Sequence, residues 1–205
     1  GKLSRRDFTK FALAGGISLG AANSLFLSAA KAQAKPGGHF RAGLGHGATT
    51  DTFDPATWAH GLNYGWGKGL TGAPLVRIDA KGAVYPYLAE SVEPADGGKK
   101  WIFKLKKGVT FHNGKSLTAD DVVGTVQYHT GKDSKSPGKA LLEAVTSVKA
   151  DGPDTVVFEL SGANADFPYL LSAYQFPILS VVDGKADLSG LGAGPYILDG
   201  FEPGV

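Results

Sequence analysis

The stretch LKKGVTFHNGKSLTADDVV, residues 105–123, combines the end of a strand, a tight turn and the start of a helix. An Asn-Gly pair places the turn at 112–115. The helix is predicted to begin at Thr118, because Thr118 can cap the first turn while Asp121 reaches back as in a capping box. Asp120 and Asp121 also favour the positive end of the helix dipole. We therefore interpret this acidic pair as helix-starting residues rather than as a pair for general acid–base catalysis.

Hydrophobic periodicity on both sides of this stretch predicts an α/β fold. Before it, Trp101, Phe103 and Leu105 occupy every second position, which predicts a strand with one buried face. After it, apolar residues of the helix fall at i, i+3, i+4 and i+7, namely at Ala119, Val122, Val123 and Val126. This spacing places one apolar stripe of the helix against a core.

Turn residues and alternation predict the remaining elements. The expected strands are 39–44, 75–78, 83–85, 145–150, 155–160 and one that follows a glycine turn within 192–198. The second and third of these form one hairpin, and the fourth and fifth another. Pro137 is placed as the first residue of a second helix that carries Leu141, Leu142 and Val145. The segment 167–177 contains two prolines and is interpreted as a packed connection without regular structure.

Composition and charge exclude several classes of protein. The 205 residues are 42% hydrophobic and 20% charged, which is the balance of a globular protein. Cysteine is absent, so disulfides and cysteine-ligated metal sites are excluded. The net charge is +2, but residues 1–34 alone carry five basic residues and one acidic residue, a local +4, which leaves the rest at −2. A mildly acidic domain without a clustered basic face is not expected to bind nucleic acid.

The first 34 residues resemble a twin-arginine export signal. The segment SRRDFTK, residues 4–10, places Arg5 and Arg6 before a large apolar residue and a nearby lysine. An apolar stretch at 11–30 follows, and Ala32-Gln33-Ala34 fits a cleavage site with small residues at both required positions. We expect cleavage after Ala34, a mature chain that begins at Lys35, and a periplasmic location reached through the twin-arginine translocase.

A membrane-spanning helix is the alternative interpretation of residues 11–30, because about 20 apolar residues suffice to cross a bilayer. Glycines and polar residues dilute the stretch, and a cleavage site follows it, so the signal is favoured. The abrupt ends of the sequence indicate a fragment at both ends.

No motif for catalysis, phosphate binding or metal binding has its required context. Residues 16–20 fit G-x-S-x-G but lie in the signal. Residues 114–116, Gly-Lys-Ser, lack the glycine that a P-loop needs five positions earlier. The glycine-rich residues 190–194 run into a proline where a helix should begin. None of the five histidines pairs at i, i+4. We predict no enzyme activity, no cofactor and no metal site.

Several segments resemble family 5 of the bacterial extracellular solute-binding proteins. They are 105–123, the preceding Pro-Tyr-Leu-Ala-Glu-Ser at 86–91, Gly-Gly at 37–38, Phe-Asp-Pro at 53–55, Thr-Val-Val-Phe at 155–158 and Gly-Ala-Gly-Pro-Tyr at 192–196. The sequence departs from the family pattern at Val92, where tryptophan is usual, at Lys106, where arginine is usual, and at Ala193, where threonine is usual. The resemblance spans residues 37–205.

This resemblance implies a two-lobed periplasmic-binding-protein-like fold of type II, whose lobes close on a ligand. Residues 35–205 would be the N-terminal portion of the solute-binding domain, comprising the first lobe and its subdomain, with the remaining lobe outside the fragment. The positions that correspond to ligand contacts in the family are Trp58, His60, Asn63, Ser136, Tyr174, Gln175 and Phe176. Each aromatic in this set has an alternative interpretation as a packing residue.

The resemblance also implies a function. We expect the periplasmic substrate-binding component of an ABC importer, a monomer that captures peptides or a related small solute and delivers them to a permease and ATPase complex. A periplasmic enzyme or cofactor-carrying protein exported in the folded state is the alternative from another class. A chemosensory or chaperone-like protein that presents ligand to a receptor is a third.

Overall fold

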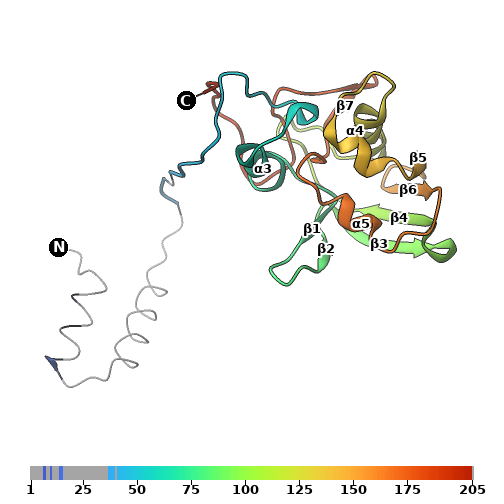
Figure 1. Ribbon diagram of the computed structural model, residues 1–205, viewed down its shortest axis with the longest axis horizontal. Coiled ribbons are helices and arrows are strands. Elements are labelled where there is room, and N and C mark those ends of the chain that lie inside the picture. The colour runs from blue at the N-terminus through green and yellow to red at the C-terminus, as the bar shows by residue number, and fades with distance from the viewer. Residues whose placement is uncertain (1–6, 8–9, 11–13, 16–36, 40, 205) are drawn as a thin grey trace. The chain divides into compact units, whose positions relative to one another are not determined.

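The computed structural model describes residues 7, 10, 14–15, 37–39 and 41–204 (Figure 1). The chain divides into two units, Gly1–Gly43 and Leu44–Val205, and the second contains every helix and strand discussed below. Arg5, Arg6, Ala34 and Lys35 lie outside the described residues, so the export signal and its cleavage site stay predictions. Among the described residues, none of the helices has the length and the apolar composition that spanning a bilayer requires.

A four-stranded antiparallel sheet forms the centre of the second unit. Its strands are β3 (Ala89–Ala95), β4 (Lys100–Leu105), β6 (Thr155–Leu160) and β5 (Val145–Ala150), in the order β3-β4-β6-β5. The alternation of buried and more exposed residues in β4 and β6 confirms the predicted strands and the hairpin that joins β5 to β6. Phe103 and Phe158 pack edge to face at 5.3 Å on the buried side.

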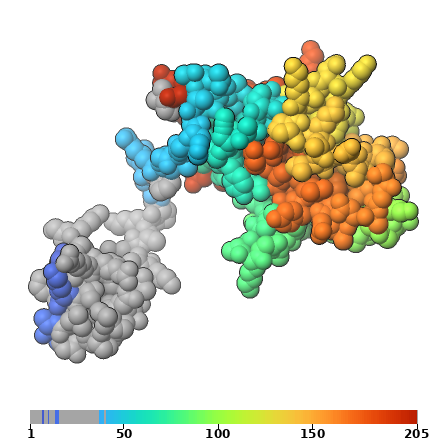
Figure 2. All heavy atoms as spheres, in the orientation of Figure 1, coloured from blue at the N-terminus to red at the C-terminus, as the bar shows by residue number. Residues whose placement is uncertain are grey.

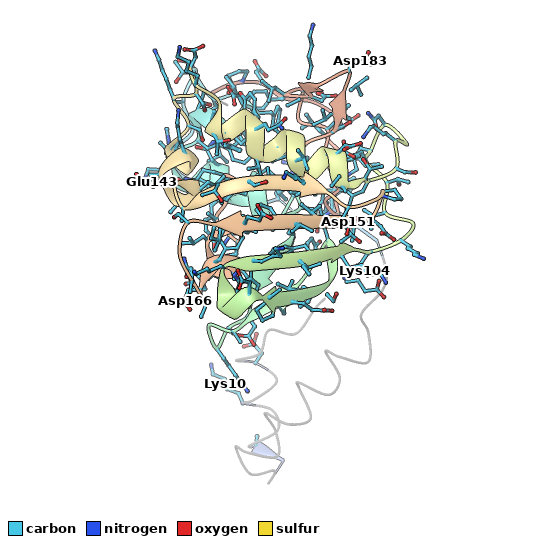
Figure 3. The ribbon with its side chains drawn as sticks, turned by 90° about the vertical axis from the view of Figure 1, so that its right-hand side faces the viewer. Lys10, Lys104, Glu143, Asp151, Asp166 and Asp183 are labelled. Carbon is cyan, nitrogen blue, oxygen red and sulfur yellow. The ribbon has the colours of Figure 1, made fainter. Side chains whose placement is uncertain are left out.

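Helix α4 (Ala119–Thr130) packs against β5 and β6, and Figure 3 shows it beside β5, with Glu143 and Asp151 near the two ends of that strand. Ala119, Val122 and Val126 are buried and Val123 is half-buried, which confirms the predicted stripe. The backbone N–H and the hydroxyl of Thr118 both donate to Asp121 Oδ2 at 2.9 Å, as the predicted capping interaction requires.

The turn before α4 forms at 112–115 as predicted. Gly114 has a φ of +84°, a conformation that favours glycine, and its N–H donates to the carbonyl of Phe111. Lys115 follows and forms an ion pair with Asp121. The carboxylate of Asp121 therefore connects the loop turn at 112–115 to the first turn of helix α4.

The smaller elements surround this sheet and helix. They are the 3-10 helices η1 (Pro55–Thr57), η2 (Asp96–Gly98) and η3 (Pro137–Leu142), the helices α3 (Gly61–Lys68) and α5 (Phe167–Leu170), and the strands β1 (Val76–Ile78), β2 (Val84–Pro86), β7 (Val181–Val182) and β8 (Lys185–Ala186). The predicted first hairpin is confirmed as β1–β2, which projects from the surface in Figure 2. The helix predicted at Pro137 is present as the 3-10 helix η3, which ends at Leu142. Val145, which was predicted to lie on this helix, is instead the first residue of β5.

Three predictions of secondary structure were wrong. His39 and residues 41–44 form no strand, because no described strand lies beside them to pair with their backbone. The segment 192–198 also forms no strand. The N–H groups of Gly194 and Tyr196 donate to Thr71 and Leu70, but the intervening proline has no N–H with which to extend a ladder. The segment 167–177 is not wholly irregular, since its first four residues form α5.

Candidate functional site

Segments 54–63, 136–142 and 174–176 contain the seven predicted ligand positions, and each segment contacts the last turn of α4. The contact of the first segment is made by Asp54, which is not itself one of the predicted positions. The Tyr128 hydroxyl donates to Asp54 Oδ1 at 2.6 Å. His129 Nδ1 lies 2.6 Å from Ser136 Oγ, within hydrogen-bond distance. The ring of His129 also packs edge to face on Phe176, with 5.1 Å between ring centroids and an interplanar angle of 89°. Two adjacent helical residues thus contact three segments that are far apart in the sequence.

The first segment is held in place by side chains that point inward. Asp54 caps η1 by accepting the N–H of Ala56 at 2.8 Å. Trp58 is only 3% exposed; its indole N–H donates to the carbonyl of Thr52 at 2.9 Å, and its ring packs against Trp66. Trp58 therefore packs inside the unit, and its contact with ligand stays a prediction.

Asn63 and His60 organise the start of α3. Asn63 is buried, and its Oδ1 accepts the N–H groups of Ala59 at 3.1 Å and His60 at 3.2 Å. His60 is half-buried, and its two ring nitrogens are buried without a hydrogen-bond partner in the described part of the chain. Tyr64, which directly follows Asn63 on α3, has an exposed ring. Asn63 thus fixes the loop, while His60 keeps unused hydrogen-bonding capacity.

Ser136 begins η3 and lies at the edge of an open groove. Its Oγ accepts the N–H of Gly138 at 3.1 Å. The groove has a volume of about 560 Å³ and is lined by Thr130, Ser136, Pro137, Lys139, Ala140, Leu142, Glu143 and Val145. Lys139 Nζ donates to the carbonyl of Gly131 at 2.8 Å, just beyond the end of α4. The groove therefore has polar and charged groups beside an apolar floor.

The third segment packs against α3. The half-buried ring of Tyr174 lies 5.7 Å from that of Tyr64, whereas Gln175 and Phe176 are buried. The backbones of α3 and this segment approach closely at Gly67, where a Cβ would lie 2.0 Å from the Tyr174 carbonyl oxygen. Glycine at position 67 therefore allows the first and third predicted segments to be neighbours.

Burial shifts the pKa values of both α4 residues that join the segments. Burial, together with the hydrogen bond and the negative charge of Asp54, raises the pKa of Tyr128. Burial lowers the pKa of His129 to about 4, although the Asp54 carboxylate and the Gln175 backbone favour its charged form. Tyr128 and His129 are consequently both uncharged at neutral pH.

Tyr128 and His129 were missed by reasoning from sequence. His129 lies three positions after Val126, so it continues the buried stripe of α4, and a histidine on an apolar stripe was the available signal. Its partner Ser136 was predicted only through the family resemblance. The contact between Tyr128 and Asp54 spans 74 positions and carries no local signal.

No metal centre is formed by the described residues, because no group of three or more His, Asp or Glu side chains among them could hold a metal ion. One histidine, one serine, one tyrosine and one carboxylate are joined in pairs by hydrogen bonds at the end of α4. This set can accept and donate hydrogen bonds to neighbouring segments or to a solute.

Comparison with known proteins identifies relatives over much of the chain. Residues 83–205 match the family model described as bacterial extracellular solute-binding proteins, family 5 middle. The oligopeptide-binding protein AppA of Bacillus subtilis is 42% identical over 93 residues, which is 45% of this chain and 17% of AppA. The dipeptide-binding protein of Escherichia coli K12 is 30% identical over 148 residues, which covers 58% of this chain and 27% of that protein. The chain spans less than a third of the length of these relatives.

Solved structures have the same fold. The complex of AppA from Bacillus subtilis with a nonapeptide aligns with a TM-score of 0.57 and 32% identity over 65% of this chain and 26% of that one. The binding protein AgaA from A. tumefaciens R10, in complex with agropinic acid, aligns with a TM-score of 0.65 and 22% identity over 76% and 32% of the two chains. The α/β fold described above thus corresponds to part of the two-lobed fold of periplasmic binding proteins. Together with the family match over residues 83–205, these likenesses show that the chain belongs to the bacterial extracellular solute-binding proteins of family 5.

Proposed function

We propose that the complete protein is the periplasmic substrate-binding component of an ABC importer that captures peptides or a related small solute. The observation that carries the proposal is the meeting of segments 54–63, 136–142 and 174–176 at one turn of α4 in a chain of this family. His60 in the first segment has two ring nitrogens without a hydrogen-bond partner among the described residues, the exposed Tyr64 directly follows this segment, and Ser136 lines the groove. Such a mixture of apolar and polar groups suits a small polar solute.

Peptides are the proposed solute class because two relatives with at least 30% identity are named for binding oligopeptides and dipeptides. Residues 35–205 would supply the first lobe and its subdomain, and the ligand would be enclosed when the second lobe closes over it. The partners would be a membrane permease and its ATPase, and the protein would act as a monomer. The ligand would be carried without a chemical step.

A thermal-shift screen of the complete protein tests this function. The probes are tri-alanine, a nonapeptide of mixed sequence, agropinic acid, a disaccharide and a nickel chelate, each at a concentration far above a micromolar Kd. Because a ligand that binds only the folded state stabilises it by mass action, at least one peptide is expected to raise the Tm by several degrees. A Tm that no probe raises would contradict solute capture, and a rise with the non-peptide probes alone would replace the proposed solute class.

A further inference from the structure

Tyr128 and His129 each bind the residue that begins a separate 3-10 helix. Tyr128 donates to Asp54, the N-cap residue of η1, through the same oxygen, Oδ1, that accepts the N–H of Ala56. One carboxylate oxygen therefore both starts η1 and attaches it to α4. A hydrogen bond to a charged acceptor is stronger than one between neutral groups, so this attachment is the stronger kind.

The 3-10 helix η3 is likewise attached to α4 through its N-cap residue. His129 Nδ1 lies 2.6 Å from the hydroxyl of Ser136, which is the N-cap residue of η3 and also accepts the N–H of Gly138. Lys139 adds a second contact between η3 and the chain that follows α4, at the carbonyl of Gly131. Both 3-10 helices thus depend on α4 for the position of their first residue.

The attachment points themselves are fixed by the core. His129 is fully buried, and Phe176 packs on its ring, so the third predicted segment is held by the same side chain. Val122 and Val126 anchor α4 in the hydrophobic core that contains β4 and β6. Movement of one segment relative to another therefore requires breaking a contact with a side chain of α4.

From these contacts we propose that Tyr128 and His129 are positioning residues, which hold η1, η3 and the segment 174–176 at fixed positions relative to one another by binding Asp54, Ser136 and Phe176. The proposal rests on the proposed function only in taking these segments as the surface that faces ligand. It assigns no contact with ligand to Tyr128 or His129.

Hydrogen exchange of the complete, ligand-free protein tests the positioning role. Tyr128→Phe keeps the ring and removes only the hydroxyl, so we expect amides in 54–63 to exchange about tenfold faster while those in 136–142 and in β4 and β6 keep their rates. His129→Phe keeps a ring against Phe176 and removes Nδ1. It should therefore accelerate hydrogen exchange of the amides in 136–142 and leave the exchange rates in 54–63 unchanged. Tyr85→Phe, at an exposed tyrosine of β2, is the matched control and should change neither segment.

Affinity for tri-alanine, measured by calorimetry on the same complete proteins, supplies the second readout. Tyr128→Phe should raise the Kd for this probe about tenfold, while Tyr85→Phe should leave it unchanged. A uniform acceleration of exchange that includes β4 and β6 would indicate general destabilisation and overturn the proposal, as would equal behaviour of Tyr128→Phe and Tyr85→Phe. If the unsubstituted protein did not bind tri-alanine, the mixed nonapeptide would serve as the probe. If it bound neither peptide, peptide capture would be contradicted, and the segment-specific exchange would by itself decide the positioning role.

Discussion

The buried carboxylate of Asp121 in α4 accepts the backbone N–H of Val181, 60 positions later in the chain, at 2.8 Å. The same side chain accepts the N–H and hydroxyl of Thr118 and pairs with Lys115, so all of its hydrogen-bonding capacity is directed at structure. Thr125, one turn further along the helix, accepts the N–H of Leu179. These two side chains attach the segment 179–181 to α4, next to the segment predicted to face ligand.

Replacing Asp121 should therefore cost far more stability than replacing the neighbouring Asp120. In Asp121→Asn a neutral side-chain amide replaces the carboxylate that pairs with Lys115 and accepts several hydrogen bonds, so some of these donors lose their acceptor. We expect a loss of about 3 kcal/mol in the free energy of unfolding. Asp120 is exposed, so Asp120→Asn is the matched control and should cost less than about 0.5 kcal/mol. Urea denaturation of the two variants measures the difference. Equal losses would show that the carboxylate of Asp121 is not the structural centre described here.

The free energy of unfolding should decrease at acidic pH, because His129 binds a proton more readily in the unfolded chain than in the folded one. Because burial lowers the folded-state pKa of His129 from the usual 6.5 to about 4, the unfolded state binds the proton first as pH falls. The contribution of His129 is fully present above about pH 6.5 and is lost between pH 6.5 and pH 4, up to about 3 kcal/mol. The groups that face this ring are the Asp54 carboxylate, the Gln175 backbone and the side chains of Tyr128, Ser136 and Phe176.

Urea titrations at pH 7.5, 5.5 and 4.5 measure this dependence. His129→Gln cannot titrate, so its free energy of unfolding should fall less steeply with acid than that of the unsubstituted protein, whatever its absolute stability. Since carboxylates titrate in the same range, the measured quantity is the difference between the two slopes. Parallel slopes would mean that His129 is not buried in its neutral form.

Position 67 should tolerate no side chain, whereas position 65 on the same helix should. In Gly67→Ala the new Cβ would lie 2.0 Å from the Tyr174 carbonyl oxygen and 2.9 Å from the Trp58 ring, so α3 must move away and about 1–3 kcal/mol should be lost. At Gly65 the nearest atom would be 3.6 Å away, and alanine should stabilise the helix by about 0.5–1 kcal/mol. Thermal denaturation should give opposite signs for the two variants, and a shared sign would contradict the close contact between α3 and Tyr174.

Export should depend on the arginine pair itself and not on positive charge. Replacing Arg5 and Arg6 together by lysine keeps the charge, but lysine lacks the planar guanidinium group, so we expect the precursor to remain in the cytoplasm. Lys31→Arg, in the same predicted signal, is the control and should be exported. Fractionation with N-terminal sequencing of the periplasmic product should give a chain that begins at Lys35. Normal export of the double lysine variant would rule out the twin-arginine route.

Local patterns were sufficient to predict the sheet and the main helix. Apolar residues occupy every second position in 101–105 and 156–160, and turn residues at 151–154 mark 145–150 and 155–160 as the arms of a hairpin. The capping residues of α4 lie within four positions of one another. Helix α3 was not predicted, because Gly61, Gly65 and Gly67 lower its intrinsic helical propensity. Its stability comes instead from tertiary contacts, such as the buried Trp66 and Asn63.

The candidate site was predicted less completely than the fold. The family resemblance pointed to segments that the structure brings together, but the residues that join them, Tyr128 and His129, were recognised only from three-dimensional contacts. A hydrogen bond between Asp54 and Tyr128 depends on how η1 and α4 pack, and no spacing in the sequence indicates it. For the same reason, the alternative interpretation of Trp58 as a packing residue could be weighed only once its 3% exposure was known.

Isothermal titration of the complete protein with peptides is the most direct test of solute capture. For tri-alanine or the mixed nonapeptide, we predict saturable heat that fits one site per chain with a Kd in the micromolar range or tighter, about −8 kcal/mol or more favourable. The absence of saturable heat with either peptide, together with no binding of the sugar, opine or nickel chelate, would contradict the account.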